Sequence, residues 1–253
     1  EWGSGNVGGE SETIIGNWLK QHGGRDSVVI ATKVAKLSTR RGLSAKNLQA
    51  ACEDSLSRLK TDYIDLYYAH EDDPQTPLEE TLGAFDSLIQ SGKVRYIAAS
   101  NFTAERLQKS LEVSRKNGFA AYVAAQDQFN LLERDYERTL QPTLVENSLS
   151  QLPYFGLARG FLTGKYRPGK SVDSMRAGGM GSYQNERGWT LLSKMDDLAQ
   201  KYQTTVSAIA LAWLRAQPSV AAPIASARTL EQLKEIMPVV ELSTEELWTL
   251  TNS

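Results

Sequence analysis

The feature of this sequence that most limits its fold is a regular alternation of short apolar runs with longer segments of helical periodicity. Runs of strand length lie at residues 27–33, 63–70, 94–100, 121–126, 149–155 and 220–226. Helical segments lie around them, at about 11–22, 44–59, 78–90, 104–116, 136–145, 190–202, 206–216, 230–237 and 244–250. Strands that alternate with helices predict an α/β protein with a parallel sheet.

Two architectures remain open for these six βα periods. A closed (β/α)8 barrel needs eight strands, and six would leave two unpaired parallel edges. A doubly wound open sheet is stable with six strands, and it usually binds a nucleotide through a Gly-x-Gly-x-x-Gly turn after its first strand. No such turn follows any of the six runs. The doubly wound open sheet is therefore the less favoured of the two architectures.

The charge and hydropathy pattern narrows the class of partner. The chain has 253 residues, a formal net charge of −2 and a sequence pI near 5.9, so nucleic acid is an unfavourable partner. No apolar run reaches the length of a membrane span, and no signal peptide opens the chain. We expect a cytoplasmic protein without membrane insertion. Cys52, the one cysteine, shares an apolar helix face with Leu48 and Leu56, which predicts a core position.

Polar side chains follow the predicted strands at their C-terminal ends, where barrel enzymes carry their chemistry. Lys33 and His70 end consecutive strands. Either residue alone is typical of a structural position. Together they indicate proton handling, because a buried ammonium lowers the pKa of a nearby phenol and an imidazole can orient a carbonyl oxygen. Strand alternation places Tyr68 on the same face as His70, and Tyr67 on the other.

Further polar groups end the later strands. Ser100, Asn101 and Gln126 offer hydroxyl and carboxamide groups that could hold another carboxamide, such as that of nicotinamide. Thr103 is also the expected N-cap of the next helix, and the two roles are compatible. A barrel hydrolase that uses Asp72 and Asp73 is a further alternative. Adjacent carboxylates point to different sides, however, and the following proline predicts a turn.

The chain contains successive stretches at Gly9–Leu19, Ala31–Lys33, Ser57–His70, Gly92–Phe102, Gln126–Leu132, Leu157–Tyr166 and Pro223–Arg228. Their resemblance to the motifs of the aldo-keto reductase superfamily, closest to its bacterial general-stress and potassium-channel β-subunit-like branches, follows the family's order along essentially the whole chain. It implies a (β/α)8 TIM barrel. It also implies that residues 1–253 form a single barrel domain lacking the first two strands, about six of the eight βα units.

The resemblance implies NADPH-dependent reduction of an aldehyde or ketone to an alcohol by hydride transfer. The family's catalytic groups are an Asp, a Tyr, a Lys and a His, and Lys33 and His70 match the last two. The Asp and the proton-donating Tyr are expected upstream of Glu1. The alternatives are a non-catalytic NADPH-binding regulatory subunit and an inactive truncated form. The expected partner is a small-molecule carbonyl substrate, and the oligomeric state is open.

By the same resemblance, NADPH lies across the strand ends. Ser100, Asn101 and Gln126 would hold its carboxamide, and Tyr154 would stack on the nicotinamide. The expected pyrophosphate loop comprises Leu157, Arg159, Gly160, Thr163, Gly164 and Lys165, and the adenosine end comprises Ser226, Arg228 and Gln232. Arg228 suits the 2′-phosphate, which favours NADPH over NADH. Ile236 stands where the family often has Asn. Trp2 is expected to line the substrate pocket, with residues 167–187 as a lid.

Overall fold

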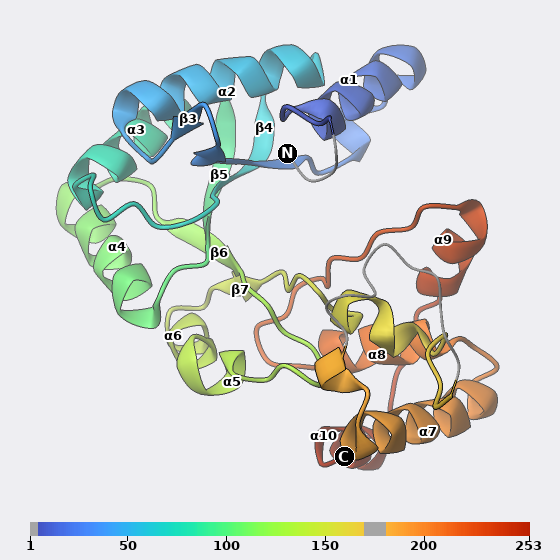
Figure 1. The fold of residues 1–253 in the computed structure, drawn as a ribbon. Coiled ribbons are helices and arrows are strands. Elements are labelled where there is room, and N and C mark those ends of the chain that lie inside the picture. Colours follow the sequence, from blue (N-terminus) through green and yellow to red (C-terminus); the bar gives the residue numbers. More distant parts are fainter. Residues whose placement is uncertain (1–4, 170–180) are drawn as a thin grey trace. The chain divides into compact units, whose positions relative to one another are not determined.

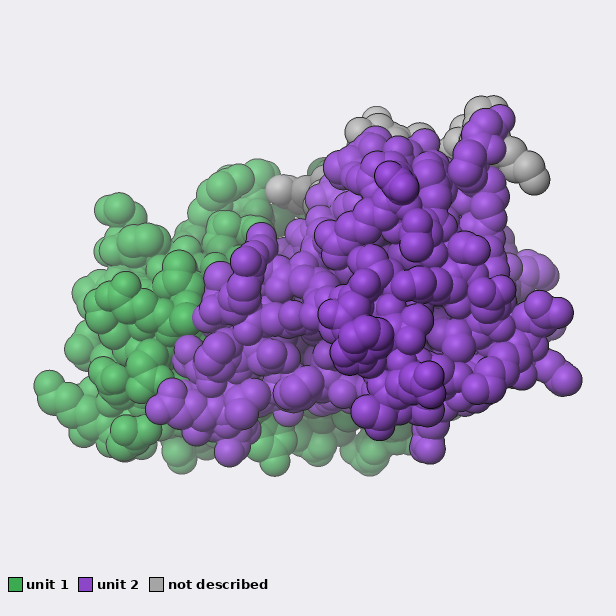
Figure 2. All heavy atoms as spheres, turned by 90° about the horizontal axis from the view of Figure 1, so that it is seen from below, with its two compact units in different colours: residues 1–125 green, residues 126–253 purple. Residues whose placement is uncertain are grey.

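The computed structural model describes residues 5–169 and 181–253 of the chain. These residues form two compact units, residues 1–125 and residues 126–253, which Figure 2 draws in different colours. Each unit has its own core, and the units are described in turn.

The first unit contains a parallel sheet. Its strands follow one another in the order β1 (Ala31–Val34), β4 (Ile64–Ala69), β5 (Val94–Ser100) and β6 (Tyr122–Gln126), of which only the last residue, Gln126, falls in the second unit. Strand β1 pairs in parallel with β4, and β4 pairs in parallel with β5. Four of the expected strands are therefore confirmed. The first begins later than predicted, because Arg25–Ser27 form a 3-10 turn. The backbone N–H of Ile30 then donates to the Asp65 carboxylate at 2.9 Å.

Helices pack along this sheet. Figure 1 shows α2 (Ala45–Leu59), α3 (Leu78–Gln90) and α4 (Ala104–Asn117) along one side of the strands, and α1 (Glu10–His22) beside α2. Ser44 caps α2, and Thr103 caps α4 as predicted, each accepting a backbone N–H with its side-chain oxygen. A short antiparallel hairpin of β2 (Lys36–Leu37) and β3 (Arg40–Arg41) was not expected.

An aromatic core fills the space between sheet and helices. The Tyr67 ring meets Phe85 of α3 edge to face at 5.8 Å, and Phe85 meets Tyr122 of β6 at 6.1 Å. Tyr67 thus points to the helix side, and its neighbour Tyr68 points the other way, as the alternation predicts. Cys52 is fully buried in α2, and burial raises the pKa of its thiol to about 12. Its predicted core position is confirmed.

Helix α1 is less buried than its apolar pattern indicates. Its buried residues are Gly16 and Leu19, whereas Ile14 stays 69% exposed and Trp18 48% exposed. The reason is a close helix crossing at Gly16. A Cβ placed there would lie 2.1 Å from the carbonyl oxygen of Arg58 in α2. This contact fixes which face of α1 meets α2.

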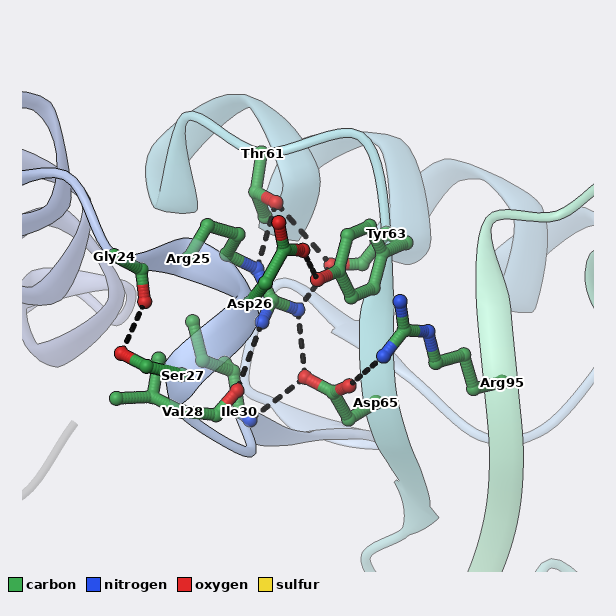
Figure 3. A network of polar contacts seen from close by, with 10 residues as sticks. All are labelled: Gly24, Arg25, Asp26, Ser27, Val28, Ile30, Thr61, Tyr63, Asp65 and Arg95. Carbon is green, nitrogen blue, oxygen red and sulfur yellow. Dashed lines mark hydrogen bonds and ion pairs between the residues drawn. The ribbon is translucent and has the colours of Figure 1, made fainter.

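A network of charged side chains closes the N-terminal ends of the strands (Figure 3). Asp65 of β4 is 7% exposed and accepts from Arg25 at 2.6 Å and from Arg95 of β5 at 2.9 Å. The Arg25 and Arg95 guanidinium carbons lie 3.8 and 3.9 Å from the centroid of the Tyr63 ring. This network ties the start of β4 to its neighbours, at the opposite end from Lys33 and His70.

The second unit is mostly helical. Its elements are α5 (Tyr136–Thr139), α6 (Gln141–Glu146), β7 (Ser150–Gln151), the 3-10 segments η2 (Ala158–Thr163) and η4 (Gly181–Tyr183), α7 (Glu186–Lys201), α8 (Val206–Arg215), α9 (Leu230–Ile236) and α10 (Thr244–Thr251). The single helix expected at 136–145 is broken in two, because Pro142 lacks the N–H that a continuous helix needs.

The last two expected strands are shorter than predicted. Within 149–155 only Ser150–Gln151 form β7, and Tyr154 adds one parallel bridge to Gln128. Residues 220–226 form no strand; they keep a bridge from Val220 to Gln151 and a hydrogen bond from Ile224 N to Pro153 O at 2.9 Å. Pro153 and Pro223 interrupt the ladder because proline has no donor.

Helix α8 forms the centre of the second core. Trp213 is fully buried, its ring lies 5.3 Å from Phe129, and its Nε1–H donates to Thr251 of α10 at 2.9 Å. Glu246 secures α10 by accepting from Lys201 and from the hydroxyl of Tyr202, each at 2.7 Å. None of the helices in the described ranges is long and apolar enough to cross a bilayer.

Candidate functional site

Four of the predicted site residues lie in the first unit, at the C-terminal ends of neighbouring strands. Lys33 in β1 is the direct partner of Tyr68 in β4, and its Nζ lies 5.2 Å from the centroid of the Tyr68 ring. The side-chain amide of Asn101 donates to the backbone oxygen of His70 at 2.9 Å and to Ser100 Oγ at 3.0 Å. The structure therefore joins His70, Ser100 and Asn101 directly.

The backbone at Asn101 explains this arrangement. Its φ is +57°, a left-handed conformation that asparagine tolerates better than most residues. The chain turns there between β5 and the N-cap of α4, and the carboxamide points back to the end of β4. Capping by Thr103 and polar contacts by Asn101 therefore coexist, as expected from the sequence.

Burial lowers the pKa values of Lys33 and His70, the two titratable side chains at these strand ends. Burial lowers the pKa of the Lys33 ammonium below its usual range. Burial, helped by the positive charges of Lys33 and Lys36, lowers the pKa of His70 to about 4. The His70 imidazole is consequently neutral near pH 7 and able to donate a hydrogen bond from one ring nitrogen while accepting at the other.

The adjacent carboxylates Asp72 and Asp73 are engaged in structural contacts. Asp72 binds Arg106 of α4 at 2.8 Å. Asp73 accepts from Leu43 N at 2.8 Å and from Thr76 Oγ1 at 2.7 Å. Burial raises the pKa of Asp73, but these hydrogen bonds outweigh it and hold the pKa below its usual value. The geometry favours a structural role over paired acid–base catalysis.

The second unit contains a cleft of about 740 Å³. Two segments far apart in the sequence provide most of its lining, the first running from Tyr154 through η2 and the second leading into α9, and the start of α8 adds Thr205 and Ser207. It brings together ten residues predicted for the cofactor site: Tyr154, Leu157, Arg159, Gly160, Thr163, Gly164, Lys165, Ser226, Arg228 and Gln232. Their prediction rested on family resemblance, and the structure places them around one cavity.

The cleft also contains residues that the sequence argument missed. These are Phe155, Gly156, Thr205, Ser207, Ile224, Ala225 and Glu235, with Ile236 beside them. The sequence does offer one sign of Gly156, because a glycine there directly follows the two aromatic residues Tyr154 and Phe155. A Cβ there would lie 2.8 Å from Leu214 Cδ1 and 3.8 Å from the backbone oxygen of Ile224. Glycine thus lets the loop approach α8 closely.

Positive charge dominates the ionisable side chains of the lining. Arg159, Lys165 and Arg228 are accompanied by one carboxylate, Glu235. The Arg159 guanidinium stacks over the Phe155 ring at 4.6 Å. The backbone of Arg228 donates to the Gln232 side chain at 2.9 Å, which fixes the start of the second segment. Such a cleft suits an elongated ligand that carries separate anionic groups.

Two predicted site residues, Gln126 and Trp2, belong neither to the strand-end group of the first unit nor to the cleft lining of the second. Gln126 ends β6 and is 6% exposed; it falls in the second unit, whereas Ser100 and Asn101 belong to the first. A joint carboxamide site of these three residues stays a prediction. Trp2, expected to line the substrate pocket, lies outside the described residues, as does the greater part of the expected lid at 167–187.

Comparisons with known proteins fit this geometry. A sequence model of the Aldo/keto reductase family matches residues 6–252. The chain is 36% identical to "Uncharacterized oxidoreductase YrpG" of Bacillus subtilis, over 97% of this chain and 77% of that protein. It is 33% identical to "Aldo-keto reductase YhdN" of the same organism, over 96% of this chain and 73% of that protein.

A third relative has a different kind of name. The chain is 34% identical to "Putative voltage-gated potassium channel subunit beta" of Schizosaccharomyces pombe, over 92% of this chain and 72% of that protein. The family match extends through both compact units. The chain therefore belongs to the aldo/keto reductase family, a family of oxidoreductases with the (β/α)8 barrel fold.

Proposed function

We propose that this protein reduces small-molecule aldehydes or ketones to alcohols with NADPH. The observation that carries the proposal is the cleft of the second unit, which gathers ten predicted cofactor residues around an excess of positive charge. Membership of an oxidoreductase family supports the same reaction type. We also propose that residues 1–253 belong to one barrel domain of a cytoplasmic enzyme.

The residues present fit NADPH, which supplies the hydride when bound. Arg159 and Lys165 provide cations for a pyrophosphate, and the loop that carries them has glycines at positions 160 and 164 with φ of +103° and +77°. Glycine adopts these conformations without strain and has no side chain to block the approach of a ligand. Arg228 provides a cation for the 2′-phosphate. Tyr154 offers an aromatic face for the nicotinamide ring, and Ser100, Asn101 and Gln126 offer carboxamide partners.

In the proposed reaction His70 and Lys33 have separate tasks. Neutral His70 donates a hydrogen bond that orients the carbonyl oxygen of the substrate, which a low pKa makes possible at neutral pH. Buried Lys33 lowers the pKa of a phenol by its positive charge. We propose that the phenol belongs to a tyrosine N-terminal to Glu1, as the family resemblance implies, and that it protonates the alkoxide.

Turnover tests this proposal. Full-length protein should oxidise NADPH in the presence of an activated aromatic aldehyde. Lys33→Met should lower kcat by roughly 10²- to 10⁴-fold, the usual range for a lost acid–base group, and leave the Kd for NADPH unchanged. Lys46→Met, which changes an exposed lysine of α2, is the matched control and should keep full activity. Equal activity of the Lys33→Met and Lys46→Met variants would refute the catalytic role.

The second candidate function is a regulatory subunit that binds NADPH without rapid turnover. The name of the Schizosaccharomyces pombe relative favours it. NADPH binding by the full-length protein without reduction of any of a panel of aldehydes and ketones would support this alternative over the reductase.

A further inference from the structure

Two side chains that do not line the cleft contact residues that do: Asn130 binds Phe155, and Tyr183 binds Arg159. Glu133 joins these two side chains to each other. We propose that all three are positioning residues, which hold the Arg159 guanidinium toward an anionic ligand in the cleft. The identity of that ligand rests on the proposed NADPH site. The contacts lie entirely within the second unit and within the described residues.

Asn130 is the fixed point of the arrangement. It is fully buried, and its side-chain oxygen accepts from Leu132 N at 2.9 Å and Glu133 N at 3.0 Å. Its side-chain nitrogen donates to Glu133 Oε2 at 2.8 Å and to the backbone oxygen of Phe155 at 3.0 Å. All four contacts are short, so both oxygen and nitrogen are fully used and the amide orientation is determined.

The hydrogen bond from Asn130 holds the backbone of Phe155, which is one of the residues that line the cleft. Phe155 has a φ of +55°, an uncommon conformation for an aromatic residue, and its carbonyl also accepts from Ala158 N at 2.7 Å. Such a backbone persists only where neighbouring contacts hold it. The Phe155 ring is the surface on which the Arg159 guanidinium stacks. Asn130 thereby fixes the platform under Arg159.

Tyr183 fixes the guanidinium from another side. Its hydroxyl donates to Glu133 and accepts from Arg159. Burial, and then the hydrogen bond to Glu133, raises the pKa of Tyr183 to about 12, so the phenol is neutral near pH 7. A neutral oxygen holds the guanidinium without forming an ion pair. The positive charge of Arg159 therefore stays available to an anion.

The Tyr183 ring is itself anchored. It lies 5.8 Å from the ring of Phe161, and Tyr183 is only 7% exposed. A Cβ on Gly188 at the start of α7 would lie 1.9 Å from the Tyr183 backbone oxygen, so α7 packs directly against it. The contacts thus form a closed circuit from Asn130 through Phe155, Arg159, Tyr183 and Glu133 back to Asn130.

The decisive variant is Tyr183→Phe in the full-length protein. It keeps the ring and removes only the hydroxyl. The Kd for NADPH should rise about tenfold, which is the effect of one lost hydrogen bond to a charged group. Tyr166→Phe is the matched control, because Tyr166 stacks on the same Phe161 ring at 6.3 Å and its buried hydroxyl has no partner among the described residues. It should leave the Kd unchanged.

A double-mutant cycle separates positioning from general stability. In the Arg159→Ala background, Tyr183→Phe should cause no further loss of NADPH affinity, because its effect passes through Arg159. Glu133→Gln, which keeps an acceptor for the phenol, should bind NADPH better than Glu133→Ala. The inference is overturned if Tyr183→Phe binds NADPH as tightly as Tyr166→Phe, or if its effect is the same with and without Arg159.

A measurement without cofactor distinguishes this inference from the proposed function. The Nε–Hε signal of Arg159, assigned by its loss in Arg159→Ala, should shift in the NMR spectrum of Tyr183→Phe and stay in place in Tyr166→Phe. If it shifts while Arg159→Ala leaves the Kd for NADPH unchanged, positioning stands and the cofactor assignment fails. An unmoved Arg159 signal would overturn the inference whatever the cofactor does.

Discussion

His70 illustrates how position rather than residue type decides the chemistry of a side chain. An imidazole usually titrates near neutrality, but burial and the nearby ammonium groups of Lys33 and Lys36 lower its pKa to about 4. Its place at the end of β4 could be predicted from the sequence. Its protonation could not, because that depends on burial and on charges brought close by the fold.

The first prediction concerns this pKa. NMR titration of the His70 ring, assigned with a His70→Asn variant, should give a pKa near 4. The pKa should rise part of the way to its usual value in Lys33→Met, since burial remains. Because the folded-state pKa lies below the unfolded-state value of 6.5, this contribution to stability is complete above that value. It is lost as the pH falls from there through 4. A folded-state pKa at the usual value would contradict the account.

The second prediction concerns coenzyme choice. Arg228→Ala should raise the Kd for NADPH about tenfold to hundredfold and leave the Kd for NADH nearly unchanged, because one charge-assisted contact to the 2′-phosphate is lost. Fluorescence titration with both coenzymes measures this. Lys234→Ala removes an exposed cation of α9 outside the cleft lining and should change neither constant. An equal loss of affinity for both coenzymes would contradict this prediction, because it would show that Arg228 contacts a group that NADPH and NADH share and not the 2′-phosphate.

At the scale of elements, strands with continuous apolar runs were predictable and interrupted ones were not. Val94–Ser100 forms a strand over the whole predicted range. Residues 220–226 have similar apolar content, but Pro223 and the facing Pro153 leave only isolated backbone contacts. The circuit around Asn130 and Tyr183 gave no sequence signal, because its members are distant in the chain and the contacts arise only on folding.

The third prediction tests the network at the N-terminal strand ends. Asp65→Asn should lower the free energy of unfolding by about 2 kcal/mol, because Arg25 and Arg95 lose a largely buried ionic partner. Asp54→Asn is the control, since its pair with Arg40 is exposed and should contribute less than about 1 kcal/mol. Urea denaturation measures both. Equal effects of the two substitutions would show that burial of Asp65 does not matter.

At the scale of the molecule, the two compact units carry different parts of the proposed chemistry. The first holds Lys33 and His70 at its strand ends, and the second holds the cationic cleft. Strand ends could be found from periodicity alone. The cleft residues could be assigned only through resemblance to a family, because a Gly-rich loop and a distant Arg228 share no local pattern.

Titration of the folded full-length protein with NADPH, followed by tryptophan fluorescence, tests the central claim most directly. The account predicts a saturable change in fluorescence that Lys33→Met preserves, since Lys33 is assigned to proton transfer and not to cofactor binding. A folded full-length protein that shows no saturable response to NADPH would contradict the account.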